Sequence, residues 1–218
     1  MKKSEISKFY PILINLQRFP SLVIGGGEVA LRKVQTLLSF SGKITVLSPK
    51  ICKPLKELIK ANKIKIIPKP YSKEYIKNYK IIFSATNNRK INEQVHNDCN
   101  KENILLNVVD VPDLCDFILP AIVKRGDLTI SVSSQGRAPF YAKEIKNKID
   151  HIFPLYYKDI IDLAGNFRSV LMSNKRYNSP KIKQKAFMKF FMIDWKKVLE
   201  NEGKKKANEC MCNIIKEL

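Results

Sequence analysis

The sequence predicts an α/β fold: a doubly wound parallel sheet, then a small strand-and-helix segment, then a helical C-terminal part. Three observations lead to this prediction. Short apolar runs alternate with segments of helical apolar spacing through the first half of the chain. A glycine-rich turn separates the first run from the first helix, and beyond Pro154 the spacing is helical. Alternation of this kind favours a parallel sheet with helices on both faces.

The expected sheet has five strands, and its strand order follows from the connections between them. Right-handed crossovers give the order 3-2-1-4-5, in which a ligand binds at the carboxyl ends of the strands, where strands 1 and 4 diverge. A lead-in at 9–16 is interpreted as an edge strand, since Pro11 suits an edge better than a centre. Strands are expected over 21–25, 43–47, 63–68, 80–85 and 103–109, and helices over 28–40, 51–61, 72–78 and 91–100.

The pattern changes after residue 110. Two apolar strands, 116–121 and 128–133, are expected to be joined through a turn at Gly126-Asp127. We therefore divide the chain into a Rossmann-like dinucleotide-binding part (1–113), a strand-and-helix segment (114–153) and a helical part (154–218). The helices expected in the last two parts cover 138–149, 155–172, 183–200 and 205–217.

The composition bounds the class of protein. Of the 218 residues, 44% are hydrophobic, which is ordinary for a globular chain with a sizeable core. No apolar stretch reaches the roughly 18–20 residues that span a bilayer, and no apolar signal core follows the basic N-terminus, so we expect a cytoplasmic protein without a membrane partner. Five cysteines without framework spacing argue against a disulfide scaffold, and two distant histidines lead us to assign no metal ligands.

The net charge of +20 is spread along the chain and comes mostly from lysine. One interpretation is a compositional bias of the genome. A second is a polyanionic small-molecule ligand. A third is nucleic acid, but the chain contains neither a recognisable nucleic-acid module nor an arginine-rich strip, so we expect no nucleic-acid partner.

The glycine turn has the order that a dinucleotide site requires: strand, turn, amphipathic helix. Gly25 allows the tight turn and Gly27 lets backbone amides approach a pyrophosphate, while Ala30 takes the place of a third glycine. The first helical residues, Glu28 and Val29, would approach the same pyrophosphate at the positive end of the helix dipole. The alternative is a glycine turn that only packs.

The adenosine end of this site lacks the usual acidic residue after strand 2. Ser48, Pro49 and Lys50 occupy that place, and Ser48 or a backbone amide would bind the ribose hydroxyls. Lys50 and Lys53 would also accept a 2′-phosphate, so the chemistry leaves NAD and NADP open. At the end of strand 4, Ala85 and Thr86 would border the nicotinamide half.

Five longer motifs occur in order along the chain: Gly25–Lys33, Ser84–Asn87, Asn107–Asp110, Leu114–Ala121 and Lys124–Gly136. Together they resemble one family, the precorrin-2 dehydrogenases of the siroheme synthase group, including bifunctional dehydrogenase–ferrochelatase members. The resemblance extends over about residues 9–153, and the helical tail matches only loosely. Gln135 and Ala138 depart from the family pattern, the second at a helix cap worth about 1 kcal/mol.

The resemblance implies an NAD-dependent oxidation of precorrin-2 to sirohydrochlorin, and in bifunctional members the insertion of ferrous iron to give siroheme. It implies a homodimer, joined through the segment after Asp110, and a tetrapyrrole substrate whose carboxylates suit a basic cleft. It also implies that Asp110 takes a proton from the substrate and that Ser134 lies at the substrate site.

Local chemistry offers a simpler interpretation of each of these residues. Asp110 could be a turn aspartate before Pro112, Ser134 could bond within its own turn, and Cys115 is more often a packed thiol than an iron ligand. A protein that binds NAD or a tetrapyrrole as a sensor or carrier, without turnover, is the alternative function.

Overall fold

A computed structural model describes residues 8–40 and 42–218. The chain divides into two compact units, residues 1–119 and Pro120–Leu218. The finer boundaries expected at residues 113 and 153 stay a prediction.

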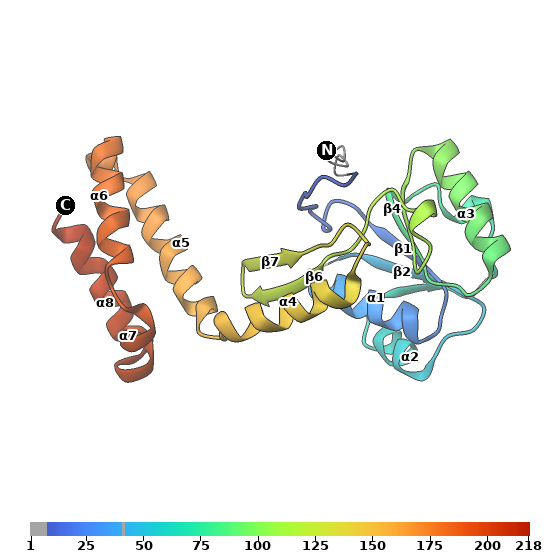
Figure 1. The fold of residues 1–218 in the computed structure, drawn as a ribbon, viewed down its shortest axis with the longest axis horizontal. Helices are drawn as coiled ribbons and strands as arrows, with labels where there is room; N and C mark the ends of the chain where they lie inside the picture. Colours follow the sequence, from blue (N-terminus) through green and yellow to red (C-terminus); the bar gives the residue numbers. More distant parts are fainter. Residues whose placement is uncertain (1–7, 41) are drawn as a thin grey trace, which may run out of the picture. The chain divides into compact units, whose positions relative to one another are not determined.

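The first unit is built on a parallel sheet of five strands in the order β3-β2-β1-β4-β5 (Figure 1). This confirms the predicted order 3-2-1-4-5. Each of the four neighbouring pairs is parallel, so all five carboxyl ends lie along one edge of the sheet. The strands are β1 Ser21–Ile24, β2 Ile44–Leu47, β3 Lys65–Ile67, β4 Ile81–Ser84 and β5 Leu105–Val108.

Helices cover both faces of this sheet, and each face has its own apolar core (Figure 1). Val23 of β1 packs with α1 and α2, whereas its neighbours Leu22 and Ile24 pack on the opposite face with α3. Because both faces are covered, β1, β2 and β4 are buried along their whole length. The helices are α1 Glu28–Leu38, α2 Lys53–Lys60 and α3 Arg89–Glu102, with short 3₁₀ turns at Lys73–Tyr75 and Pro112–Leu114.

Two expected strands are wrong. Residues 9–16 form no strand; Ile14 and Leu16 instead pack their side chains against the core beneath α1. Residues 116–120 form no strand either, because Asp116 attaches this segment to β5 through two hydrogen bonds with Leu106 instead of a strand ladder. Its N–H donates to the Leu106 carbonyl (2.8 Å) and its Oδ2 accepts the Leu106 N–H (2.9 Å).

The second unit begins with an antiparallel hairpin of β6 (Ala121–Arg125) and β7 (Leu128–Val132). Arg125 pairs with Leu128 across a two-residue loop, in which Gly126 has a φ of +59°. The turn was therefore predicted correctly, but the first strand lies later in the chain than expected.

The rest of this unit is helical, as predicted, with one difference. The helix expected over 183–200 is two helices, because the side chain of Asp194 caps a new helix by accepting the Lys197 N–H (3.0 Å). A core that includes Leu163, Phe167, Phe190 and Trp195 joins these helices. The elements are α4 Pro139–Ile152, α5 Tyr157–Ser173, α6 Pro180–Phe191, α7 Trp195–Asn201 and α8 Gly203–Lys216, with a 3₁₀ turn at Lys175–Tyr177.

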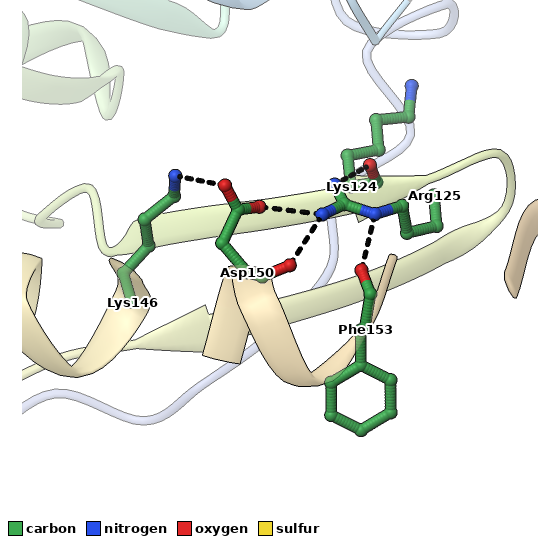
Figure 2. Close-up of polar contacts among 5 residues, drawn as sticks. All are labelled: Lys124, Arg125, Lys146, Asp150 and Phe153. Atoms are coloured by element: carbon green, nitrogen blue, oxygen red, sulfur yellow. Dashed lines mark hydrogen bonds and ion pairs between the residues drawn. The ribbon is translucent and has the colours of Figure 1, made fainter. Parts of the chain in front are cut away.

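Arg125 fixes the hairpin to the end of α4 (Figure 2). Its guanidinium donates to the carbonyls of Phe153 (2.6 Å) and Asp150 (3.1 Å), which the helix leaves without partners at its C-terminus. It also pairs with the Asp150 carboxylate at 2.8 Å, and Lys146 approaches the other carboxylate oxygen at 3.3 Å. The contact with Arg125 holds the pKa of Asp150 below its ordinary value.

None of the described helices has both the length and the apolar character needed to cross a membrane.

Candidate functional site

The carboxyl edge of the sheet gathers the turns that follow β1, β2, β4 and β5. The Gly25 N–H donates to the Leu47 carbonyl (3.0 Å) after β2, and the Ala85 N–H donates to the Ile24 carbonyl (2.8 Å). The Val109 N–H in turn donates to the Ser84 carbonyl (2.9 Å). These bonds hold the four turns side by side, which is where a doubly wound fold binds its ligand.

Two glycines of the turn after β1 are required by the backbone around them. Gly25 has a φ of +121°, and a side chain there would collide with the Ala85 carbonyl. A side chain at Gly26 would collide with the Lys50 carbonyl. The sequence pattern predicted no role for Gly26, because only the tertiary contact with the loop after β2 makes this glycine necessary.

The third glycine, Gly27, opens onto free space and precedes α1 directly. A Cβ built at Gly27 meets no atom within 4 Å, and no side chain caps the helix. The first-turn N–H groups, including those of Glu28 and Val29, therefore have no partner within the helix. Ala30, behind them, is fully buried in the core with Val23. This backbone cradle fits a diphosphate, since no side chain fills it and its N–H groups and dipole favour an anion.

The loop after β2 closes one side of the cradle. The Cys52 N–H donates to the Gly26 carbonyl at 2.8 Å, and the Ser48 hydroxyl donates to the Lys50 carbonyl at 2.6 Å. Ser48 is buried, whereas Pro49 and Lys50 are exposed. The proton of the Ser48 hydroxyl is thus already used, and its oxygen keeps acceptor capacity only.

The turn after β4 is held by a small polar network. The Ser84 hydroxyl donates to Asn92 Oδ1 (2.7 Å), and Asn92 Nδ2 donates to the Thr86 carbonyl (3.1 Å). Ala85 and Thr86 are half-buried beside an open hollow lined by residues 86–90. The turn is therefore rigid at Ala85 and open to solvent beyond it.

Asp110 lies in the turn that follows β5 and is exposed. Its φ of +61° is left-handed, a conformation that aspartate tolerates better than most residues but that still has an energetic cost. A strained residue at a ligand-binding edge is a reasonable candidate for a functional role. Asp110 thus lies just beyond the carboxyl end of the fifth strand, as the sequence order predicts.

Lys33 of α1 was not singled out from the sequence. Burial lowers the pKa of Lys33, and the negative charge of Asp110 opposes this effect. Helical spacing placed Lys33 only on the polar side of α1, and the influence of a residue far along the chain had no local signal.

Cys115 is a packed thiol. Its Sγ accepts the Val108 N–H (3.2 Å) and lies 3.2 Å from the Val108 carbonyl and 3.3 Å from the Val111 carbonyl, both potential acceptors. Burial raises its pKa. Within the described part of the chain, no three His, Cys, Asp or Glu side chains are grouped as metal ligands.

Ser134, in the second unit, supports the start of α4. Its Oγ accepts the Ala138 N–H at 3.0 Å and its carbonyl accepts the Arg137 N–H at 3.0 Å. This bond supplies the capping contact that Ala138 itself lacks. The hydroxyl is half-buried and keeps its own proton to donate.

Comparisons with known proteins agree with this geometry. Residues 12–121 match a family model described as "Putative NAD(P)-binding". A siroheme synthase of Ruthia magnifica subsp. Calyptogena magnifica is 42% identical over 160 residues, 73% of this chain and 34% of the relative. One of Buchnera aphidicola subsp. Acyrthosiphon pisum is 32% identical over 208 residues, 95% of this chain and 43% of the relative.

The chain thus spans about a third to two fifths of the length of these relatives. Among solved structures, "SirC, precorrin-2 dehydrogenase" matches with a TM-score of 0.73 and 21% identity, covering 95% of this chain and all of that one. At that identity the likeness supports the fold. The curated relatives that it resembles are siroheme synthases. The family match and the glycine cradle together lead to one conclusion: the chain belongs to the putative NAD(P)-binding family.

Proposed function

We propose that this protein oxidises precorrin-2 to sirohydrochlorin with NAD as the acceptor, as a step of siroheme biosynthesis in the cytoplasm. One observation carries the proposal: the open backbone cradle and the exposed Asp110 lie on the same edge of one sheet. The names of the siroheme synthase relatives and of the structural neighbour supply the substrate.

The residues divide the work as follows. The N–H groups of Gly27, Glu28 and Val29 hold the diphosphate, and the turn at Ala85 and Thr86 supports the nicotinamide half. When bound, NAD supplies an acceptor for the hydride that leaves the tetrapyrrole. Asp110 takes the proton that leaves with it, so the cofactor receives a hydride with both electrons and the carboxylate receives one proton. The hydroxyl of Ser134 donates to a substrate carboxylate.

A second reaction extends the proposal. Insertion of ferrous iron into sirohydrochlorin releases two pyrrole protons, and Asp110 would accept them one after the other, passing each to solvent. The resemblance to bifunctional members supports this extension, in which iron is a substrate rather than a resident cofactor.

We also propose a homodimer that forms through the second unit. Its helix α4 and the residues after it expose large apolar side chains: Phe140 (76%), Ile152 (64%) and Leu155 (79%). Exposed apolar patches of this kind mark interaction surfaces. Sedimentation of the wild type and of Phe140→Ser would test the assignment, with a shift toward monomer expected for the variant and a monomeric wild type contradicting it.

The central test mixes the purified protein with precorrin-2 and NAD, with and without ferrous iron, and follows NADH and tetrapyrrole absorbance. Asp110→Asn is the informative variant, because asparagine also tolerates the left-handed backbone. We expect it to fold, bind NAD and lose about 10²–10⁴-fold in oxidation rate. Asp113→Asn, in the same exposed loop, is the control and should keep the rate. Dinucleotide binding without NADH formation would instead identify a sensor or carrier.

A further inference from the structure

The outward face of α6 carries large apolar side chains that the helical core does not use. This helix packs against α5 and α8 through Ala186 and Phe190, which are buried (Figure 1). Met188, Phe191 and Met192 point away from that core and are 63%, 80% and 87% exposed. Spacings of three and four residues bring these three side chains together on the surface, where they form an apolar patch. Such patches mark interaction sites.

The same face of α6 is basic. Lys181 and Lys185 are exposed and lie one and two helical turns before the apolar patch, on the same side of the helix. Residues 163–193 contain seven lysines and arginines and no acidic residue, although the chain's 20 acidic residues would on average put about three there. Glu217 of α8 borders this face, and it pairs with Lys189 at 2.7 Å. The excess of positive charge is therefore a local feature of this surface.

The charges distinguish between the partners that would cover an apolar face. A second copy of the chain docked through the same face would bring like charges together, which is costly. The cores of protein interfaces favour arginine and are depleted of lysine, whereas all four cations of α6 are lysines. Lysine beside exposed phenylalanine is typical of segments that lie on anionic lipid, because the ammonium groups meet the headgroups and the apolar side chains enter the acyl boundary.

We propose that α6 attaches this protein reversibly to an anionic lipid surface. Phe191 and Met192 enter the bilayer interface, and Lys181 and Lys185 bind the headgroups. The inference goes beyond the proposed function, because α6 belongs to the second unit and carries none of the residues assigned to precorrin-2 oxidation. It revises the expectation of no membrane partner, which was based on the lack of a spanning or signal segment; attachment to a surface requires neither.

Cosedimentation of the full-length protein with lipid vesicles tests the inference. The vesicles contain phosphatidylcholine alone or phosphatidylcholine mixed with phosphatidylglycerol, in about 0.15 M salt. We expect binding to the mixed vesicles, little binding to the neutral ones, and weaker binding as the salt concentration rises. Because a chain with a net charge of +20 is attracted to any anionic surface, variants must identify the face that makes the contact.

The charge variant is Lys181→Glu combined with Lys185→Glu. It should weaken binding to the mixed vesicles by at least about tenfold, since each lysine near an anionic surface contributes about fivefold. Lys56→Glu combined with Lys60→Glu is the matched control, with the same charge change at the same spacing on the exposed side of α2. It should weaken binding by no more than about twofold, because its charges act only at long range.

The apolar variant is Phe191→Ser combined with Met192→Ser. It keeps every charge and should still weaken binding by about tenfold, because two large side chains no longer enter the bilayer interface. Leu13→Ser, at an 87% exposed position in the first unit, is the matched control and should bind like the wild type. Thermal melts verify that each variant is folded.

Four results would overturn the inference. They are no binding of the wild type to mixed vesicles, equal losses in the α2 and α6 charge variants, full binding by the apolar variant, and a shift of the apolar variant from dimer to monomer without vesicles. The last result would identify the face as a contact between copies of the chain. The rate of precorrin-2 oxidation should be the same in all these variants, so the proposed function is tested separately.

Discussion

The two units bury their apolar residues in different ways. In the first, the sheet is covered on both faces, and β1, β2 and β4 are wholly buried. In the second, α5–α8 share one core, but α4 buries only Ala142 and the hairpin buries only Val123 among their described residues. We infer that the first unit and the helical core each bury enough apolar surface to be stable. The hairpin and α4 bury little, so they depend on polar contacts such as those of Arg125 and on apolar contact with a further surface.

The largest expected effect is on the free energy of unfolding, and it is tested with one buried aromatic residue from each core. Phe83→Ala in the sheet and Phe167→Ala in the helical core should each reduce the free energy of unfolding by about 3–5 kcal/mol. If the units fold independently, each variant lowers only one transition in differential scanning calorimetry. Phe191→Ala, at an 80% exposed position, is the control. A single transition lowered equally by both variants would show that the units fold as one.

Substitutions at two glycines separate stability from binding in the first unit. Gly25→Ala introduces both a strained φ and a collision with the Ala85 carbonyl, so we expect a loss of roughly 2 kcal/mol or more in urea unfolding. Gly27→Ala faces open space, and the poorer N-cap is partly offset by the lower entropy of the unfolded chain, so we expect a loss of less than about 1 kcal/mol. Its methyl group should nevertheless weaken NAD binding, and unchanged affinity would argue against the cradle.

The arginine contact of the second unit should matter less and depend on pH. Arg125→Met leaves the carbonyls of Asp150 and Phe153 without their donor and should reduce stability by about 1–3 kcal/mol. The folded pKa of Asp150 lies below the ordinary value of 3.8, so its contribution is present above that value and is lost as pH falls through the folded pKa.

Thermal melts between pH 6 and pH 2 should therefore show a smaller acid loss in Arg125→Met than in the wild type. Lys148→Met, an exposed lysine on α4, is the control and should keep the acid loss of the wild type. Identical acid profiles for the wild type and Arg125→Met would contradict the assignment of the contact.

The smallest effect concerns Lys33. Because burial lowers its folded pKa, the native state gives up this proton more readily, and wild-type stability should rise as pH increases through the folded pKa. Lys33→Met lacks that rise and should match or exceed the wild type by up to about 1 kcal/mol at pH 7. Urea titrations at pH 7 and pH 10 measure both effects, and a destabilised variant at pH 7 would show that attraction to the charge of Asp110 outweighs the cost of burial.

Features with a local sequence signal could be predicted, whereas features that depend on distant contacts could not. The strand order and the glycine turn were predictable because apolar periodicity and turn residues are local signals. The strand expected over 116–121 was wrong because Asp116 satisfies the edge of β5 with its side chain, and Phe117 packs edge-on against Phe83 instead of extending a ladder. The break before α7 did have a signal, the capping residue Asp194, within otherwise continuous helical spacing.

The missed site features, the need for Gly26 and the influence of Asp110 on Lys33, depend on residues distant in the chain. A single sequence contains no pattern that reports such contacts. Ser134 is a different case, because its bond to the Ala138 N–H is local and matches the simpler interpretation, bonding within its own turn.

The chain contains one tryptophan, and its surroundings give it a use beyond packing. Trp195 lies against Phe190 at a centroid distance of 4.5 Å, and its indole N–H donates to the Phe190 carbonyl at 2.8 Å. Its emission spectrum therefore reports the integrity of the helical unit alone, without any attached dye. Red-shifted fluorescence from a protein that still binds NAD would reveal loosening confined to that half of the molecule.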